Sequence, residues 1–130
     1  MTAGTSDTIR TAESLVLIAI GGFAGANLRH LVGDAVGGAS GTLLVNVLGS
    51  FALGFLLYEA RYSGVISRRS RIVVGTGFLS SFTTYSTFAL ETVGFGIYGV
   101  GYVTTSYALG FAGVLAGRWL ALRLDGGDRR

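Results

Sequence analysis

The sequence contains no cysteine, no proline and no lysine, and only 13% of its 130 residues are charged. The absence of cysteine excludes a disulfide-stapled scaffold and a thiolate metal centre. A soluble domain carries about a quarter charged residues, so the shortage of charge argues against a water-exposed globule. Apolar residues make up 50% of the chain, which also has 22 glycines. This apolar content excludes a disordered chain and indicates a membrane protein.

The charged residues are clustered, and the gaps between them form four apolar runs. These runs are Ser14–Leu28, which continues past Arg29 to Gly33, then Ala35–Tyr58, Ile72–Leu90 and Thr92–Gly117. A bilayer core of about 30 Å is crossed by roughly 20 helical residues, so each run predicts one crossing. We expect an all-α membrane protein with four transmembrane helices, at about residues 14–33, 37–59, 72–94 and 99–121. Residues 1–13 would form a polar N-terminal tail, and residues 123–130 a charged C-terminal tail.

The first run has an alternative interpretation as a secretory signal peptide. Arg10 precedes the apolar stretch, and Ala24-Gly25-Ala26 resembles a cleavage site. We favour a membrane span because three further runs follow and because Arg29-His30 would stand just after the cleavage site.

Small residues recur at helical spacing within the predicted spans. Examples are Gly21 with Gly25, and Gly110 with Gly113 and Gly117. In lipid, helices associate through close van der Waals packing, which small residues permit. We therefore expect tightly packed helices, and oligomerisation, because four thin helices enclose little space alone.

Arginine is distributed unevenly about the spans. With four crossings, the N-terminus, the loop between spans two and three and the C-terminus share one side, which carries nine arginines against Arg29 on the other. The positive-inside rule then predicts that both termini are cytoplasmic. A nucleic-acid site is the alternative interpretation of the cluster Arg61–Arg71, but a topology signal beside the membrane accounts for it, and we expect no nucleic-acid partner.

Polar residues within the spans mark either packing contacts or a permeation path, because unpaired polar groups are costly in hydrocarbon. Six of the eight residues from Ser80 to Thr87 are serine or threonine. Their hydroxyls can bond to the carbonyls of the preceding turn and loosen a helix. An interrupted helix in the membrane is tolerated only where it is buried in protein or lines a cavity. We therefore expect the third span to be interrupted in mid-membrane and to line a pore or an ion site.

Polar residues in span two, in span four and at the end of span one each have two interpretations. Asn46, in the middle of span two, either joins helices or offers an uncharged donor to an anion. Tyr102, Ser106 and Gly110 share one helix face, which either packs or extends a track of hydroxyls. Arg29 either reaches back to the membrane interface or faces a water-filled vestibule and concentrates anions there.

The sequence contains no cluster of His, Asp, Glu or Cys that suggests a transition-metal or hydrolytic centre. His30 is the single histidine. A nucleophile with a base and an orienting group is not visible, so we do not expect an enzyme.

Three segments, Gly22–Arg29, Gly41–Asn46 and Thr83–Phe88, together with Glu91, resemble the CrcB/Fluc family of fluoride channels. The resemblance covers about residues 15–122. It implies a four-helix protomer that forms an antiparallel dimer with two pores, through which fluoride leaves the cytoplasm by passive efflux. It also implies a structural Na+ at the dimer centre, held by the backbone carbonyls of Ser80 and Thr83.

The resemblance further assigns a pore to a set of side chains that surround fluoride with an amide, hydroxyls and aromatic ring edges. These are Asn46, Tyr85, Ser86, Thr87, Phe88, Tyr102 and Ser106, with Arg29 in the vestibule. Two positions depart from the family pattern. Tyr85 stands where phenylalanine is normal, and Ser80 where glycine is usual.

The arginine bias bears on how such a dimer would form. A chain that inserts in both orientations should have little bias, whereas this chain has nine arginines against one. The partner in an antiparallel dimer would therefore be either a second copy or an oppositely oriented paralogue.

Two other functions are compatible with a membrane protein of four helices. A proton-coupled exporter of the small multidrug-resistance type uses a buried glutamate in its first span, but here Glu13 stands only at the mouth of that span. A non-conducting assembly subunit would need only the glycine-rich helices, and it would leave the hydroxyl cluster of span three unexplained.

Overall fold

The computed structural model describes residues 2–127, which contain helices and no strand. Three helices are long: α1 (Thr2–Val36), α2 (Gly38–Tyr62) and α6 (Gly99–Gly127). The remaining segment is divided into shorter pieces: α3 (Arg68–Arg71), the π-helix η1 (Ile72–Leu79), α4 (Ser80–Phe82), α5 (Ser86–Gly94) and the 3₁₀-helix η2 (Gly96–Tyr98).

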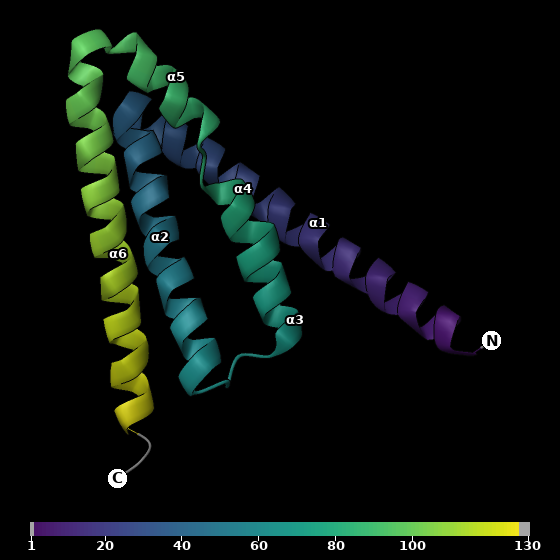
Figure 1. Ribbon diagram of the computed structural model, residues 1–130. Coiled ribbons are helices and arrows are strands. Elements are labelled where there is room, and N and C mark those ends of the chain that lie inside the picture. Colours follow the sequence, from purple (N-terminus) through teal and green to yellow (C-terminus); the bar gives the residue numbers. More distant parts are fainter. Residues whose placement is uncertain (1, 128–130) are drawn as a thin grey trace.

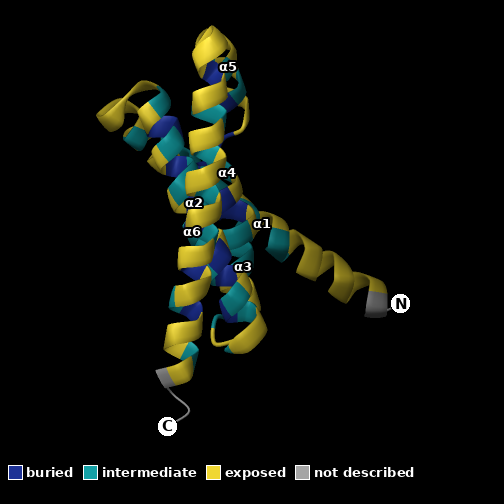
Figure 2. Ribbon diagram, turned by 60° about the vertical axis from the view of Figure 1, so that its left-hand side comes forward, coloured by how far each residue is buried: buried dark blue, intermediate teal, exposed yellow. Residues whose placement is uncertain are grey.

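The helices form a bundle in which α2 and α6 lie side by side and run in the same direction (Figure 1). The η1 and α4 pieces continue one another beside α2, and α1 packs chiefly against η1. The first turns of α1 extend away from the other helices, and residues 4–12 are exposed (Figure 2). Burial is concentrated where the helices cross.

The predicted all-α membrane fold is confirmed. Gly4–Val36, Gly38–Tyr62 and Gly96–Gly126 are each long and apolar enough to cross a membrane. The third apolar run of the sequence lies between the second and third of these as the broken helix from η1 to α5, and a fourth crossing there stays a prediction.

The predicted interruption of the third span is also confirmed. Helix α4 ends at Phe82, Thr83 is extended (φ −80°, ψ 160°), and α5 begins only at Ser86. Hydroxyls contribute to this break as expected: Thr83 Oγ1 donates to the Leu79 carbonyl at 3.0 Å, and Ser80 Oγ donates to the Thr76 carbonyl.

The outer helices are longer than their predicted spans. Helix α1 begins at Thr2, so the part of the predicted N-terminal tail that the structure describes is helical. Thr8 and Thr11 each donate a hydroxyl hydrogen bond of 2.9 Å to a carbonyl one turn earlier, and no proline interrupts the segment. Helix α6 continues to Gly127, and residues 128–130 of the predicted C-terminal tail lie outside the described residues.

Glycines permit the closest helix contacts. A methyl group on Gly21 or Gly25 of α1 would overlap the carbonyl of Val73 or Phe78 in the third span. On the other side of the bundle, a methyl group on Gly117 of α6 would overlap the Phe51 carbonyl of α2. These glycines therefore serve helix packing, as predicted.

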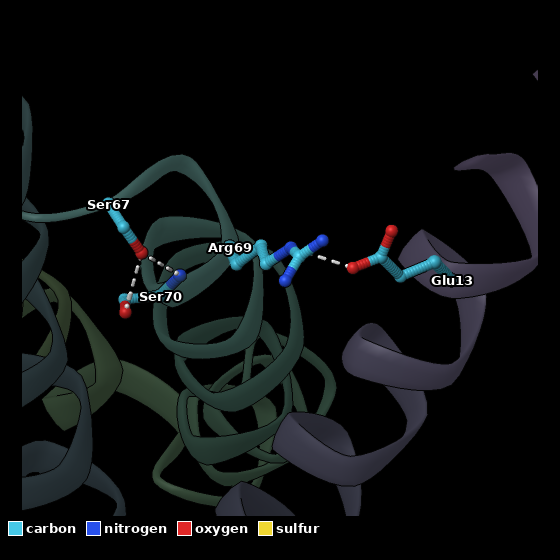
Figure 3. Close-up of polar contacts among 4 residues, drawn as sticks. All are labelled: Glu13, Ser67, Arg69 and Ser70. Carbon is cyan, nitrogen blue, oxygen red and sulfur yellow. Dashed lines mark hydrogen bonds and ion pairs between the residues drawn. The ribbon is translucent and has the colours of Figure 1, made fainter.

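Two contacts show which loops share an end of the bundle. Glu13 of α1 forms an ion pair of 2.7 Å with Arg69 of α3 (Figure 3), beside Ser67, whose hydroxyl accepts a hydrogen bond from the Ser70 amide. At the same end, Ser63 Oγ donates to Asp125 Oδ1 at 3.1 Å. The part of α1 around Glu13, the α2–α3 loop and the end of α6 therefore lie toward the same end of the bundle.

Candidate functional site

A groove of about 550 Å³ runs between α2, α6 and the broken third span. The helix break forms one wall of it, and the neighbouring faces of α2 and α6 form the others. None of the residues that line the groove is charged. The lining residues are Asn46, Gly49, Ser50, Leu53, Gly75, Leu79, Ser80, Thr83, Thr84, Tyr85, Phe88, Ser106, Tyr107, Gly110, Phe111 and Val114.

Asn46 holds the break in place. Its Nδ2 donates to the Thr84 carbonyl at 2.9 Å, and its Oδ1 accepts from the Thr84 amide at 2.8 Å. The side-chain amide thus replaces the hydrogen bonds that the interrupted helix cannot make for Thr84. Of the two interpretations of Asn46, the structure supports the joining of helices, while the second Nδ2 hydrogen leaves one donor for another partner.

The Thr84 side chain starts the helix that follows the break. Its buried Oγ1 accepts from the Thr87 amide at 3.3 Å and donates to Thr87 Oγ1 at 3.1 Å. A hydroxyl placed three residues before a free amide is a usual helix N-cap. Thr84 therefore faces α2 through its backbone and α5 through its side chain.

Three aromatic rings meet beside the groove. Phe88 is buried, and its ring centroid lies 5.9 Å from that of Tyr85 and 5.3 Å from that of Tyr102. Tyr85 is 74% exposed, so its ring lies at the open side of the groove. Tyr85 and Phe88, two of the aromatic residues predicted for the pore, are therefore neighbours, with Phe88 inside the bundle and Tyr85 at its surface.

Arg29 and the two predicted carbonyl ligands also lie at the break. Arg29 Nη1 donates to the Thr83 carbonyl at 3.4 Å, so the guanidinium faces the break. The Ser80 carbonyl lacks its regular helical partner, because the Thr84 amide four residues later donates to Asn46 instead. The structure therefore gathers Arg29, Ser80 and Thr83 in one region.

The predicted hydroxyl track is only partly assembled in one chain. Ser106 Oγ is buried at the groove and has no hydrogen-bond partner among the described residues. Ser86 and Thr87 are exposed on the first turn of α5. Tyr102 does not line the groove, because its hydroxyl points to another polar cluster.

That cluster, the Glu91 network, joins the predicted pore residue Tyr102 to Thr42 and Glu91, which were not among the predicted site residues. Thr42 Oγ1 donates to Glu91 Oε1 at 2.9 Å, and the Tyr102 hydroxyl donates to Glu91 Oε2 at 2.7 Å. Both carboxylate oxygens are thus paired inside the bundle by residues 49 and 11 positions away. A carboxylate at the end of span three was the available sequence signal, but its partners follow only from how the helices pack.

The Glu91 network gives a stability prediction. Thr42→Val and Tyr102→Phe each leave one oxygen of Glu91 without its donor, so each should lower the free energy of unfolding by about 1–3 kcal/mol. The double variant should lose less free energy of unfolding than the two single variants lose together, because both donors bind the same carboxylate. Denaturant unfolding in detergent measures this; strict additivity would contradict the network.

Comparison with known proteins agrees with this architecture. The family model described as CrcB-like protein, Camphor Resistance (CrcB), matches residues 16–118. The chain is 55% identical over 119 residues to "Fluoride-specific ion channel FluC 1" of Haloarcula marismortui, covering 92% of this chain and 94% of the relative. It is 50% identical over 121 residues to "Fluoride-specific ion channel FluC 2" of Halobacterium salinarum, with the same shares covered. A relative from Methanospirillum hungatei, "Fluoride-specific ion channel FluC 1", is 42% identical over 121 residues, covering 92% of this chain and 86% of its own.

Proposed function

Because this chain belongs to the CrcB family, we propose that it is a fluoride-selective channel that lowers cytoplasmic fluoride by passive efflux. The observation that carries the proposal is the uncharged groove at the helix break, with the unpartnered Ser106 hydroxyl buried in it. The family also favours a transport role over catalysis.

The chemistry of the groove suits a small, strongly hydrated anion. Leaving water is costly for such an ion unless donors replace its hydration shell. Ser106 Oγ and the second Nδ2 hydrogen of Asn46 are uncharged donors, and the rim of the Phe88 ring is electropositive. Conduction requires binding that is favourable but escapable, and a groove without a fixed positive charge meets that requirement.

The direct test is fluoride efflux from liposomes that contain the purified chain, followed with a fluoride electrode and compared with chloride. Phe88→Leu keeps an apolar side chain but removes the ring edge, and it should slow fluoride efflux at least about tenfold if the edge contributes roughly 1.4 kcal/mol. Tyr85→Phe keeps both the ring and its edge and should retain efflux. Equal fluoride and chloride efflux by the wild-type chain would refute the channel proposal.

We further propose that two antiparallel copies, or this chain and an oppositely oriented paralogue, complete the pores. The 74% exposure of Tyr85 beside the groove supports a partner that covers this side. The mass of the purified chain in detergent, read with its efflux activity, distinguishes the two: an active homodimer requires no paralogue, whereas an inactive monomer requires one.

A structural Na+ at the dimer centre is part of the same proposal. The Ser80 and Thr83 carbonyls are uncharged, hard oxygen ligands, and the break frees Ser80 from its helical bond. Two carbonyls are too few for such a cation, which takes several oxygens, so the partner would supply the others. Because the Arg29 guanidinium donates to the Thr83 carbonyl, it would have to move away from that oxygen for the ion to bind. Replacing Na+ by choline should therefore weaken the dimer; an unchanged dimer would count against the ion.

The orientation of the chain stays a prediction from its arginines. The end of the bundle that holds Glu13, Arg69 and Asp125 should face the cytoplasm together with both termini. A reporter enzyme that is active only outside the cytoplasm should be inactive when it is fused to the C-terminus. Activity of this fusion would show that the C-terminus lies outside the cytoplasm and would contradict the prediction.

A further inference from the structure

A second cavity, of about 420 Å³, lies at the end of the bundle where the α2–α3 loop meets the end of α6. Glu59, which lines it, is 13 residues beyond Asn46 on α2, or about 20 Å along the helix axis. The cavity is therefore well removed from the groove at the helix break. Its lining residues are Phe55, Glu59, Tyr62, Ser63, Val65, Ile66, Ala121, Leu124 and Asp125.

Glu59 is buried here with half of its carboxylate unpaired. Its side chain is only 6% exposed, and Oε1 accepts a hydrogen bond of 2.8 Å from the Ile66 amide. Oε2 is buried and has no hydrogen-bond partner in the part of the chain that the structure describes. Burying a carboxylate oxygen without a partner is costly, so this atom calls for a ligand.

The other polar groups of the cavity are also oxygens. Asp125 of α6 adds a second carboxylate, and its Oδ1 accepts from Ser63 Oγ at 3.1 Å. The guanidinium of Arg71 donates through Nε and Nη2 to the Ile66 carbonyl at 3.0 and 2.6 Å and not to Glu59. No ion pair involving Glu59 occurs among residues 2–127.

We propose that this cavity binds a hard, oxygen-coordinated cation, with Glu59 Oε2 as its buried ligand and Asp125 and Ser63 as further oxygen donors. Such a cation takes water in the cavity to complete its shell, as Mg2+ and Ca2+ sites with few protein ligands do. The ion would fasten the α2–α3 loop to the end of α6.

The experiment compares thermal unfolding of the purified chain in NaCl, MgCl2 and CaCl2 with choline chloride at equal ionic strength. At least one cation should raise the unfolding midpoint of the wild-type chain, and Glu59→Gln and Asp125→Asn should each abolish that rise. Glu13→Gln removes a half-exposed carboxylate, paired with Arg69 at the same end of the bundle and not part of the cavity, and should keep the rise. These outcomes also separate the cavity from the Na+ proposed at the dimer centre, because neither carboxylate contacts the break.

A spectroscopic readout keeps the test independent of stability. Tb3+ bound in the cavity should show emission sensitised by Tyr62, lost in Tyr62→Phe, lost in Glu59→Gln and displaced by the cation that raises the midpoint. A wild-type chain that responds to no cation beyond choline would overturn the proposal. So would a cation response that survives in both Glu59→Gln and Asp125→Asn.

Discussion

Asn46→Ala should release the helix break and abolish most fluoride efflux. The substitution leaves the amide and the carbonyl of Thr84 without their partners at 2.8 and 2.9 Å. Each unsatisfied buried group costs about 1–3 kcal/mol. A loss of roughly 2.7 kcal/mol changes the population of the native break about a hundredfold. The unfolding midpoint in detergent and efflux from liposomes should therefore fall together.

The chain offers a matched control in its other asparagine of the spans. Asn27 is exposed, and its Nδ2 donates at 2.7 Å to the Phe23 carbonyl of its own helix. Asn27→Ala removes a hydrogen bond within one turn of α1 and should leave both readouts close to wild type. Asn46→Ala with wild-type stability and efflux would show that the break holds without the side chain.

Gly117→Ala should separate α6 from α2 and destabilise the protein by about 2 kcal/mol. The added methyl group would overlap the Phe51 carbonyl and approach the Phe55 amide nitrogen to 2.7 Å. Both obstacles are backbone atoms, so the helices must move apart, and overpacking of this kind costs about 1–3 kcal/mol or more. The gain in helix propensity, about 1 kcal/mol at most, offsets only part of it. Denaturant unfolding in detergent measures the difference.

Gly101→Ala is the control for that substitution. Gly101 lies in the same helix, and a methyl group there meets nothing within 4 Å. The free energy of unfolding of the Gly101→Ala variant should be unchanged or higher by up to about 1 kcal/mol, because alanine has a higher helix propensity than glycine. Equal destabilisation by both substitutions would mean that loss of glycine flexibility, and not the contact with α2, governs the stability of α6.

The sequence by itself determined the features that depend on local composition. Long runs without charge must be helical in lipid, since every backbone group needs an internal partner, so the spans could be located from hydropathy. The break in the third span followed from Ser80–Thr87, whose hydroxyls compete for backbone carbonyls within one turn. Helix ends were less well determined: α1 starts at Thr2, because hydropathy indicates which part of a helix can lie in lipid and not where the helix itself begins.

Only the tertiary structure decided which polar groups meet. Asn46 reaches Thr84 across 38 positions, and Thr42 reaches Glu91 across 49, because α2 packs against the third span. The direction of Arg29 toward Thr83 and the burial of Glu59 likewise depend on neighbouring helices. Such contacts have no local signature: helix propensity and hydropathy are properties of one segment, whereas a hydrogen bond between helices depends on the rotation and register of both.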